Sequence, residues 1–189
     1  MSFLGRMILG IFFGFSLLNA APYMIDKAHS EVGFSVKHLM ISNVKGDFTK
    51  YEGEIDFDPK SKTFNKLNAV VSVNSIDTGI EDRDNHLKSA DFFYAQKFPN
   101  IIFNMKTYED GKVIGELTMR GVTKEVELEV EELATVRDLK GNNRVGFSLK
   151  GKVNRMDYGL KWNKALEFGG VAVGEDVKIL IEVEAVEKK

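Results

Sequence analysis

The sequence Lys124-Glu125-Val126-Glu127-Leu128-Glu129-Val130-Glu131 alternates charged and aliphatic residues through its whole length. Because successive side chains of a β-strand point to opposite faces, this order places the glutamates on one face and the aliphatic residues on the other. One face of such a strand meets water and the other meets an apolar interior. The stretch therefore predicts a half-buried strand of an antiparallel sheet.

The same period of two recurs in seven further segments, which predicts eight strands in all. Their inward residues are Val32, Phe34 and Val36; Phe48, Tyr51, Ile55 and Phe57; Leu67, Ala69, Val71 and Val73; Ile101, Phe103 and Met105; Val113, Leu117 and Met119; Val145, Phe147, Leu149 and Val153; and Val177, Ile179, Ile181, Val183 and Ala185. Two of the segments, 44–58 and 144–155, are expected to form unusually long strands.

An all-β fold follows from this pattern. Eight antiparallel strands with one apolar face each can close into a barrel, which removes the exposed edges that invite aggregation. We therefore expect an extended eight-stranded antiparallel β-barrel with one or two short helices, one of them over 81–89, and a loop over 169–174. The alternative is a two-layer sandwich whose apolar faces fill each other.

The N-terminus reads as an export signal. Arg6 precedes an apolar run over 7–18, and Ala20 supplies the small residue that favours cleavage. We expect residues 1–20 to be a cleaved signal peptide and residues 21–189 to form one domain. The run is shorter than the roughly 20 residues of a membrane-spanning helix, so we expect a periplasmic or secreted protein that is not membrane-anchored.

Composition narrows the function classes further. The formal net charge is −2, which argues against a nucleic-acid partner, and the chain contains no cysteine for a disulfide or a lipid anchor. No glycine-rich phosphate loop leads from a strand into a helix. Because the chain has no cysteine and so no disulfide, its folded state must be stabilised by the burial of its core.

The inward faces supply candidates for the lining of an apolar tunnel. These are Phe34, Val36, Phe48, Tyr51, Ile55, Phe57, Val71, Val73, Ile101, Phe103, Met105, Leu117, Met119, Leu128, Phe147 and Leu149, with Trp162 at a tunnel mouth. An eight-stranded barrel has room for one small ligand or for side chains alone. Each of these residues would be equally suited to a solid core.

Charged and imidazole side chains beside the apolar positions are candidates for contact with a polar head group. They are His29, His38, Arg83, Asp84, His86, Arg155 and Asp157. The alternative is a structural network of ion pairs that ties the short helix to the barrel wall. The histidines lack the short spacings typical of zinc sites, and Asp26, His29 and Ser30 lie too close in sequence to form a hydrolase triad, so we expect no metal and no catalytic residue.

Several motifs, in order, resemble those of the YceI-like polyisoprenoid-binding proteins. They are Asp26-x-x-His29-Ser30, Phe34-x-Val36-Lys37-His38-Leu39, Gly46-x-Phe48, Ser75-Ile76-Asp77-Thr78, Arg83-Asp84-x-His86-Leu87, Asp91-Phe92-Phe93, Phe98-Pro99, Gly115-x-Leu117-x-x-Arg120-Gly121-Val122-Thr123-Lys124 and Arg155-x-Asp157-Tyr158-Gly159. Each motif is weak alone, but together they cover nearly all of 21–189.

The resemblance implies a lipocalin-like barrel whose tunnel holds a long isoprenoid or similar amphiphile, in a periplasmic homodimer without catalytic activity, metal or other cofactor. A carrier of a quinone, a prenyl phosphate, a fatty acid or a fatty amide would fit this description. The competing hypothesis is a structural or stress-related β module with a filled core and no ligand.

Overall fold

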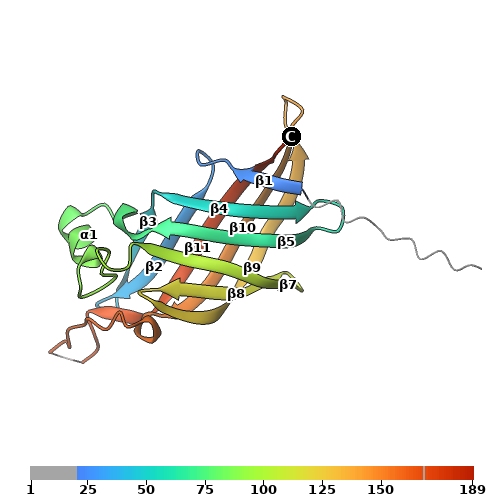
Figure 1. Cartoon of the computed structure of the whole chain (residues 1–189). Helices are drawn as coiled ribbons and strands as arrows, with labels where there is room; N and C mark the ends of the chain where they lie inside the picture. The colour runs from blue at the N-terminus through green and yellow to red at the C-terminus, as the bar shows by residue number, and fades with distance from the viewer. Residues whose placement is uncertain (1–20, 168) are drawn as a thin grey trace, which may run out of the picture.

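The computed structural model describes residues 21–167 and 169–189, so the expected signal peptide lies outside the described residues. Eight strands form a closed antiparallel ring (Figure 1). In spatial order they are β1 (Ala21–Ile25), β4 (Tyr51–Asp58), β5 (Thr63–Ser72), β7 (Asn100–Glu109), β8 (Lys112–Met119), β9 (Val122–Arg137), β10 (Asn143–Asn154) and β11 (Val173–Glu187). The ring closes where Tyr23 of β1 pairs with Glu187 of β11, which confirms the predicted barrel.

Three further strands branch from the ring. Along β11, residues 185–187 pair with β1, whereas the preceding part of the strand pairs with β2 (Glu31–His38). Beyond β2 lie β3 (Ser42–Phe48) and the short β6 (Ile76–Asp77), which follows the 3-10 turn η1 (Val73–Ser75). The wall between β4 and β11 is therefore built by β1 at one end of the barrel and by the β2–β3–β6 sheet at the other.

The prediction of one long strand over 44–58 is wrong. The chain turns at Thr49 and Lys50, where the Thr49 amide donates to the Ser75 carbonyl. β3 then pairs with β2 and β6, whereas β4 pairs with β1 and β5. Alternation of residues cannot distinguish a bulge from such a change of partner, and the short β1 and β6 were also not predicted.

Aromatic rings close one end of the barrel interior, and we call this group the aromatic plug. It consists of Tyr23, Phe57, Phe64, Tyr108 and Phe147. The Phe64 ring lies 4.8 Å from the ring of Phe147, 5.0 Å from Phe57 and 5.2 Å from Tyr108, centroid to centroid. These distances are typical of packed aromatic pairs, so this end is a solid core.

The opposite end carries the predicted short helix, α1 (Glu81–Lys88), and the segments 160–167 and 169–172, which follow the 3-10 turn η2 (Arg155–Tyr158) (Figure 1). Acidic residues occupy the first turn of α1, where their negative charge interacts favourably with the positive end of the helix dipole. The buried Asp84 carboxylate accepts a hydrogen bond of 2.9 Å from the Thr78 amide, which fixes the helix to the end of β6. Among the described residues, no helix combines the length and the apolar character that crossing a bilayer would require.

Candidate functional site

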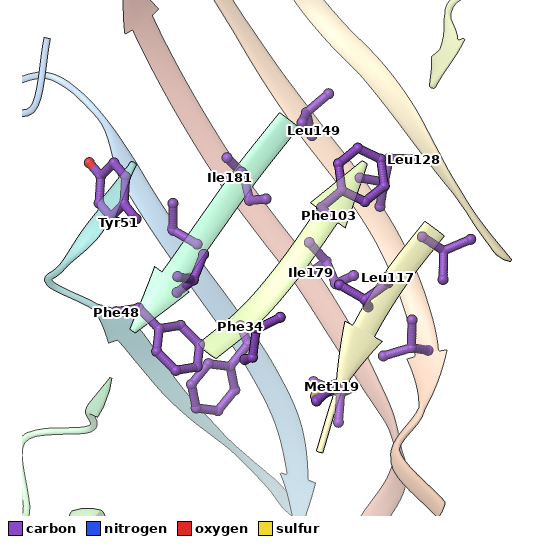
Figure 2. A pocket seen from close by; sticks show the side chains of 18 of the residues that line it. Phe34, Phe48, Tyr51, Phe103, Leu117, Met119, Leu128, Leu149, Ile179 and Ile181 are labelled. Carbon is purple, nitrogen blue, oxygen red and sulfur yellow. The ribbon is translucent and has the colours of Figure 1, made fainter. Parts of the chain in front are cut away.

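An apolar cavity of about 200 Å³ lies inside the barrel, between the aromatic plug and the α1 end. Tyr51, Glu52, Asn68 and Arg155 are the polar members of its lining, and all other lining residues are aliphatic, aromatic, methionine or glycine. Figure 2 shows Phe34 beside Phe48, whose ring centroids lie 5.8 Å apart, and Phe103 and Leu128 among the side chains that project into this space from the surrounding strands. The cavity suits a hydrocarbon chain or ring system rather than a polar substrate.

Most of the tunnel candidates lie on the cavity lining. They are Phe34, Val36, Phe48, Tyr51, Ile55, Val71, Ile101, Phe103, Leu117, Met119, Leu128 and Leu149. The shared reason is the pleat: side chains at alternate positions of a barrel strand point inwards.

Five candidates lie away from this lining. Phe57 and Phe147 belong to the aromatic plug, and Val73 is buried in η1. Met105 packs against the main core beside the irregularity in β7, and Trp162 packs against His86 and Phe92 with ring centroids 4.9 and 5.2 Å away. Alternation identifies the inward face of a strand, but it does not give the depth of a residue along the barrel axis.

Residues from the α1 region, together with Leu160 after η2, line the cavity, and sequence analysis did not place them there. Leu87, Phe92, Phe93 and Leu160 all line it. The Phe93 ring meets that of Phe48 edge to face at 6.1 Å, and the Phe93 amide donates to the Leu87 carbonyl. For Leu87, Phe92 and Phe93, the available signal was the presence of apolar residues in a segment that is otherwise charged and has no strand periodicity.

Of the seven head-group candidates, Arg155 lines the cavity and the other six do not. The Arg155 side chain is buried, and its guanidinium donates to the carbonyls of Gly174, Leu160 and Val173. Burial lowers the pKa of this guanidinium, and the nearby Glu175 opposes that shift. Arg155 is therefore a buried cation whose protein partners are neutral carbonyl groups.

The remaining candidates on α1 bond within their own segment. Arg83 donates through Nε to Thr78 Oγ1 at 2.8 Å and through a terminal nitrogen to the Thr78 carbonyl at 2.7 Å. His86 contacts Asp91 at 3.0 Å. These bonds hold the helix and the loop after it in place, but they stay within residues 78–91 and differ from the expected network of ion pairs to the barrel wall, since Arg83 bonds to Thr78 and not to a carboxylate.

His29, His38 and Asp157 are exposed. His38 ends β2, and the Asp157 carboxylate lies 3.7 Å from Lys124 Nζ. Around His29, the ligand atoms of Asp26, His29 and Glu184 lie within 4.8 Å of one another, which is a spacing compatible with a metal ion.

A guanidinium already occupies this cluster. Arg144 donates to Asp26 at 2.9 Å and also to Glu184, and its hydrogen bond lowers the pKa of the Asp26 carboxyl. A fixed positive charge between the carboxylates disfavours a second cation there. The cluster is an ion-pair network rather than a metal site.

A closed eight-stranded barrel with an apolar cavity defines the class of β-barrel that can enclose one small apolar molecule. Comparison with known proteins agrees with this class. The chain belongs to the YceI-like family, because the family model described as "YceI-like domain" matches residues 23–185.

Known relatives cover most of the chain. UPF0312 protein SA2479 of Staphylococcus aureus is 40% identical over 157 residues, which make up 82% of this chain and 92% of that protein. The crystal structure of the Campylobacter jejuni YCEI protein is similar with a TM-score of 0.70 and 41% identity, over 88% of this chain and 98% of that one.

A more distant structure shares the fold. The polyisoprenoid-binding domain from Saccharophagus degradans, implicated in plant cell wall breakdown, has a TM-score of 0.62 at 15% identity. The match covers 90% of this chain and 100% of that domain.

Proposed function

We propose that this protein is a non-catalytic binding protein that sequesters or carries one long-chain amphiphile in the barrel cavity. The observation that carries the proposal is the cavity itself, which is apolar and is lined by the barrel strands and by Leu87 and Phe93. A polyisoprenoid such as a quinone or prenyl phosphate, or a fatty acid or amide, has the required chemistry. The polyisoprenoid-binding domain of the same fold supports this choice of class.

The energetics favour a chain rather than a compact polar molecule. Removal of apolar surface from water contributes about 25 cal/mol per Å², so burying several hundred Å² favours binding by several kcal/mol before the entropic cost of association. The polar lining groups are few, so selectivity for the head group must come from a small number of contacts. Arg155 is the head-group candidate that lies on the lining.

The proposal also includes the location of the protein and its oligomeric state. The signal-peptide pattern over 1–20 supports export to the periplasm or the medium, followed by folding of 21–189 without a cofactor. The family resemblance supports a homodimer. Light scattering of the mature protein at micromolar concentration should return twice the monomer mass, and a monomer mass would contradict the dimer.

Native mass spectrometry tests the binding activity. The mature protein is purified from its exported form without detergent, its mass is measured, and any bound compound is extracted and identified. We expect one long-chain compound per chain. The matched control is Ala69→Phe, which places a ring in the cavity from the lining of β5 and should be isolated empty.

The competing function, a structural β module without ligand, predicts a different result. The protein would be isolated empty and would also fail to bind added prenyl and acyl compounds. That result would contradict the carrier proposal, because the cavity would then have no occupant of the class that its lining fits.

A further inference from the structure

Three consecutive large apolar residues are exposed at the turn between β2 and β3. Leu39, Met40 and Ile41 have 38%, 54% and 82% of their surface accessible, and we call them the hairpin tip. Leu39 and Met40 both have positive φ, 50° and 63°, which any residue other than glycine or asparagine adopts reluctantly. Met40 lies against Gly170, but much of its side chain and most of Ile41 remain exposed, so the fold leaves this apolar surface largely uncovered.

Along the two strands that the hairpin tip joins, the nearest charges are positive, whereas the neighbouring segment that pairs with the tip carries both Lys164 and Glu167. Between Glu31 and Asp47 the chain has no carboxylate, and its charged or titratable side chains are Lys37, His38 and Lys45. Lys37 and His38 are exposed directly before the tip. Within the described ranges, no carboxylate forms an ion pair with Lys37. An apolar tip with an adjacent unpaired cation is complementary to a membrane whose surface is anionic.

The hairpin tip also lies next to the end of the cavity. The Leu39 amide donates to the Ala172 carbonyl at 2.9 Å, and the next residue, Val173, lines the cavity. Val36, three residues before Leu39, lines it as well. The hairpin tip is therefore close to the cavity, and a membrane that the tip contacts would also be close to the cavity.

We propose that the hairpin tip is a membrane-docking element, which inserts its three apolar side chains among the lipids of an anionic bilayer. Its purpose rests on the proposed carrier function, since docking would let an apolar cargo pass between bilayer and cavity with little exposure to water. The physical basis of docking does not depend on the carrier function, because the favourable energy of insertion comes from the hairpin tip and from Lys37 alone. Attachment of this kind is peripheral and reversible.

The opposite end of the barrel supplies an internal comparison. The turn between β9 and β10 lies there (Figure 1). Leu139 in this turn is fully exposed at 108%, but it is a single apolar residue between Asp138 and Lys140. One isolated exposed leucine is ordinary on a protein surface. A substitution there is therefore a control for the loss of exposed apolar area as such.

Vesicle sedimentation of the mature protein tests the proposal. The vesicles contain either phosphatidylcholine alone or an equal mixture of phosphatidylcholine and phosphatidylglycerol. We expect binding to the anionic vesicles, about tenfold or more weaker binding for Ile41→Glu, and a change within about twofold for Leu139→Glu. Lys37→Gln should weaken binding about fivefold, the equivalent of one lysine near an anionic surface.

Each outcome decides the matter. Equal loss in Ile41→Glu and Leu139→Glu, or no binding to either vesicle, would overturn the proposal, and so would a hairpin tip that mediates contact between two copies. In that last case Ile41→Glu would halve the mass measured by light scattering. Ligand content measured on the same samples separates the two proposals, because Ile41 lies outside the cavity lining and its substitution should leave the bound compound in place.

Discussion

The two halves of the barrel interior differ although β4, β5 and β7 to β11 run through both. On β4 and β5, Phe57 pairs with Phe64 in the aromatic plug, whereas Gly53 pairs with Ala69 on the cavity lining. The plug positions are filled by rings in contact, and Phe57 is 0% exposed. On β4 and β5 the cavity level carries only a hydrogen atom and a methyl group, although rings such as those of Phe48 and Phe103 line the cavity from other strands. On these two strands the volume of the inward residues differs between the solid level and the hollow level.

The substitution of Phe57 by alanine should have the largest effect on stability. Removal of a fully packed ring costs about 3–5 kcal/mol of unfolding free energy. Phe34→Ala, on the cavity lining, should cost less than half as much, because one side of that ring already faces empty space. Urea denaturation of both variants measures the difference. Equal costs would mean that the two halves are packed alike.

Adding a ring, rather than removing one, tests the same difference between the solid core and the cavity. Val113→Phe, at a 0% exposed position of the core, should destabilise the protein by about 1–3 kcal/mol through overpacking. Ala69→Phe should change the unfolding free energy by less than about 1 kcal/mol, because the cavity receives the ring. A thermal melt distinguishes them, and a large destabilisation by Ala69→Phe would show that no usable space exists there.

The plug end also carries the ion-pair network of Arg144 with Asp26, Asp138 and Glu184, which the cavity end lacks among the described residues. Hydrogen bonds hold the pKa of the Asp26 and Asp138 carboxyls below their usual range. These groups stabilise the fold above pH 4, and the contribution is lost as the pH falls below that value. Arg144→Gln should therefore flatten the acid limb of a plot of stability against pH. An unchanged acid limb would mean that the network does not couple folding to pH.

The smallest effect should come from Tyr158 in η2. Burial raises the pKa of its phenol to about 12, whereas an unfolded tyrosine ionises near pH 10. The folded state is therefore stabilised below pH 10 and loses this contribution as the pH rises towards 12. Tyr158→Phe should reduce the loss of stability over that interval, measured by denaturation at pH 9 and pH 11.

Much of the barrel could be predicted from local pattern. The alternation in residues 124–131 lies within β9, and the charged segment 81–89 contains α1. The break at Thr49 and Lys50 could not be predicted, because pairing partners depend on contacts distant in sequence. The division between plug and cavity could not be predicted either, since Phe57 and Phe48 both lie on the inward face and differ in depth along the barrel.

The candidate site shows the same limit. The inward residues of the strands were accessible to prediction, but Leu87 and Phe93 reach the cavity through the tertiary position of α1. Among the charged candidates, sequence could not separate Arg155, which lies on the lining, from Arg83, which bonds to Thr78. Both residues are arginines, and they differ in burial and in hydrogen-bond partners, which depend on the tertiary structure.

The dependence of affinity on ligand chain length tests the central claim most directly. Dissociation constants are measured for a series of fatty acids and prenyl alcohols of increasing length, with the wild-type protein and with Phe57→Leu. We predict that affinity rises about fourfold per added methylene, the equivalent of about 0.8 kcal/mol, and then reaches a plateau when the chain meets the aromatic plug. The plateau should move to longer chains in Phe57→Leu. An affinity that does not depend on chain length would contradict the account of a cavity closed by the plug.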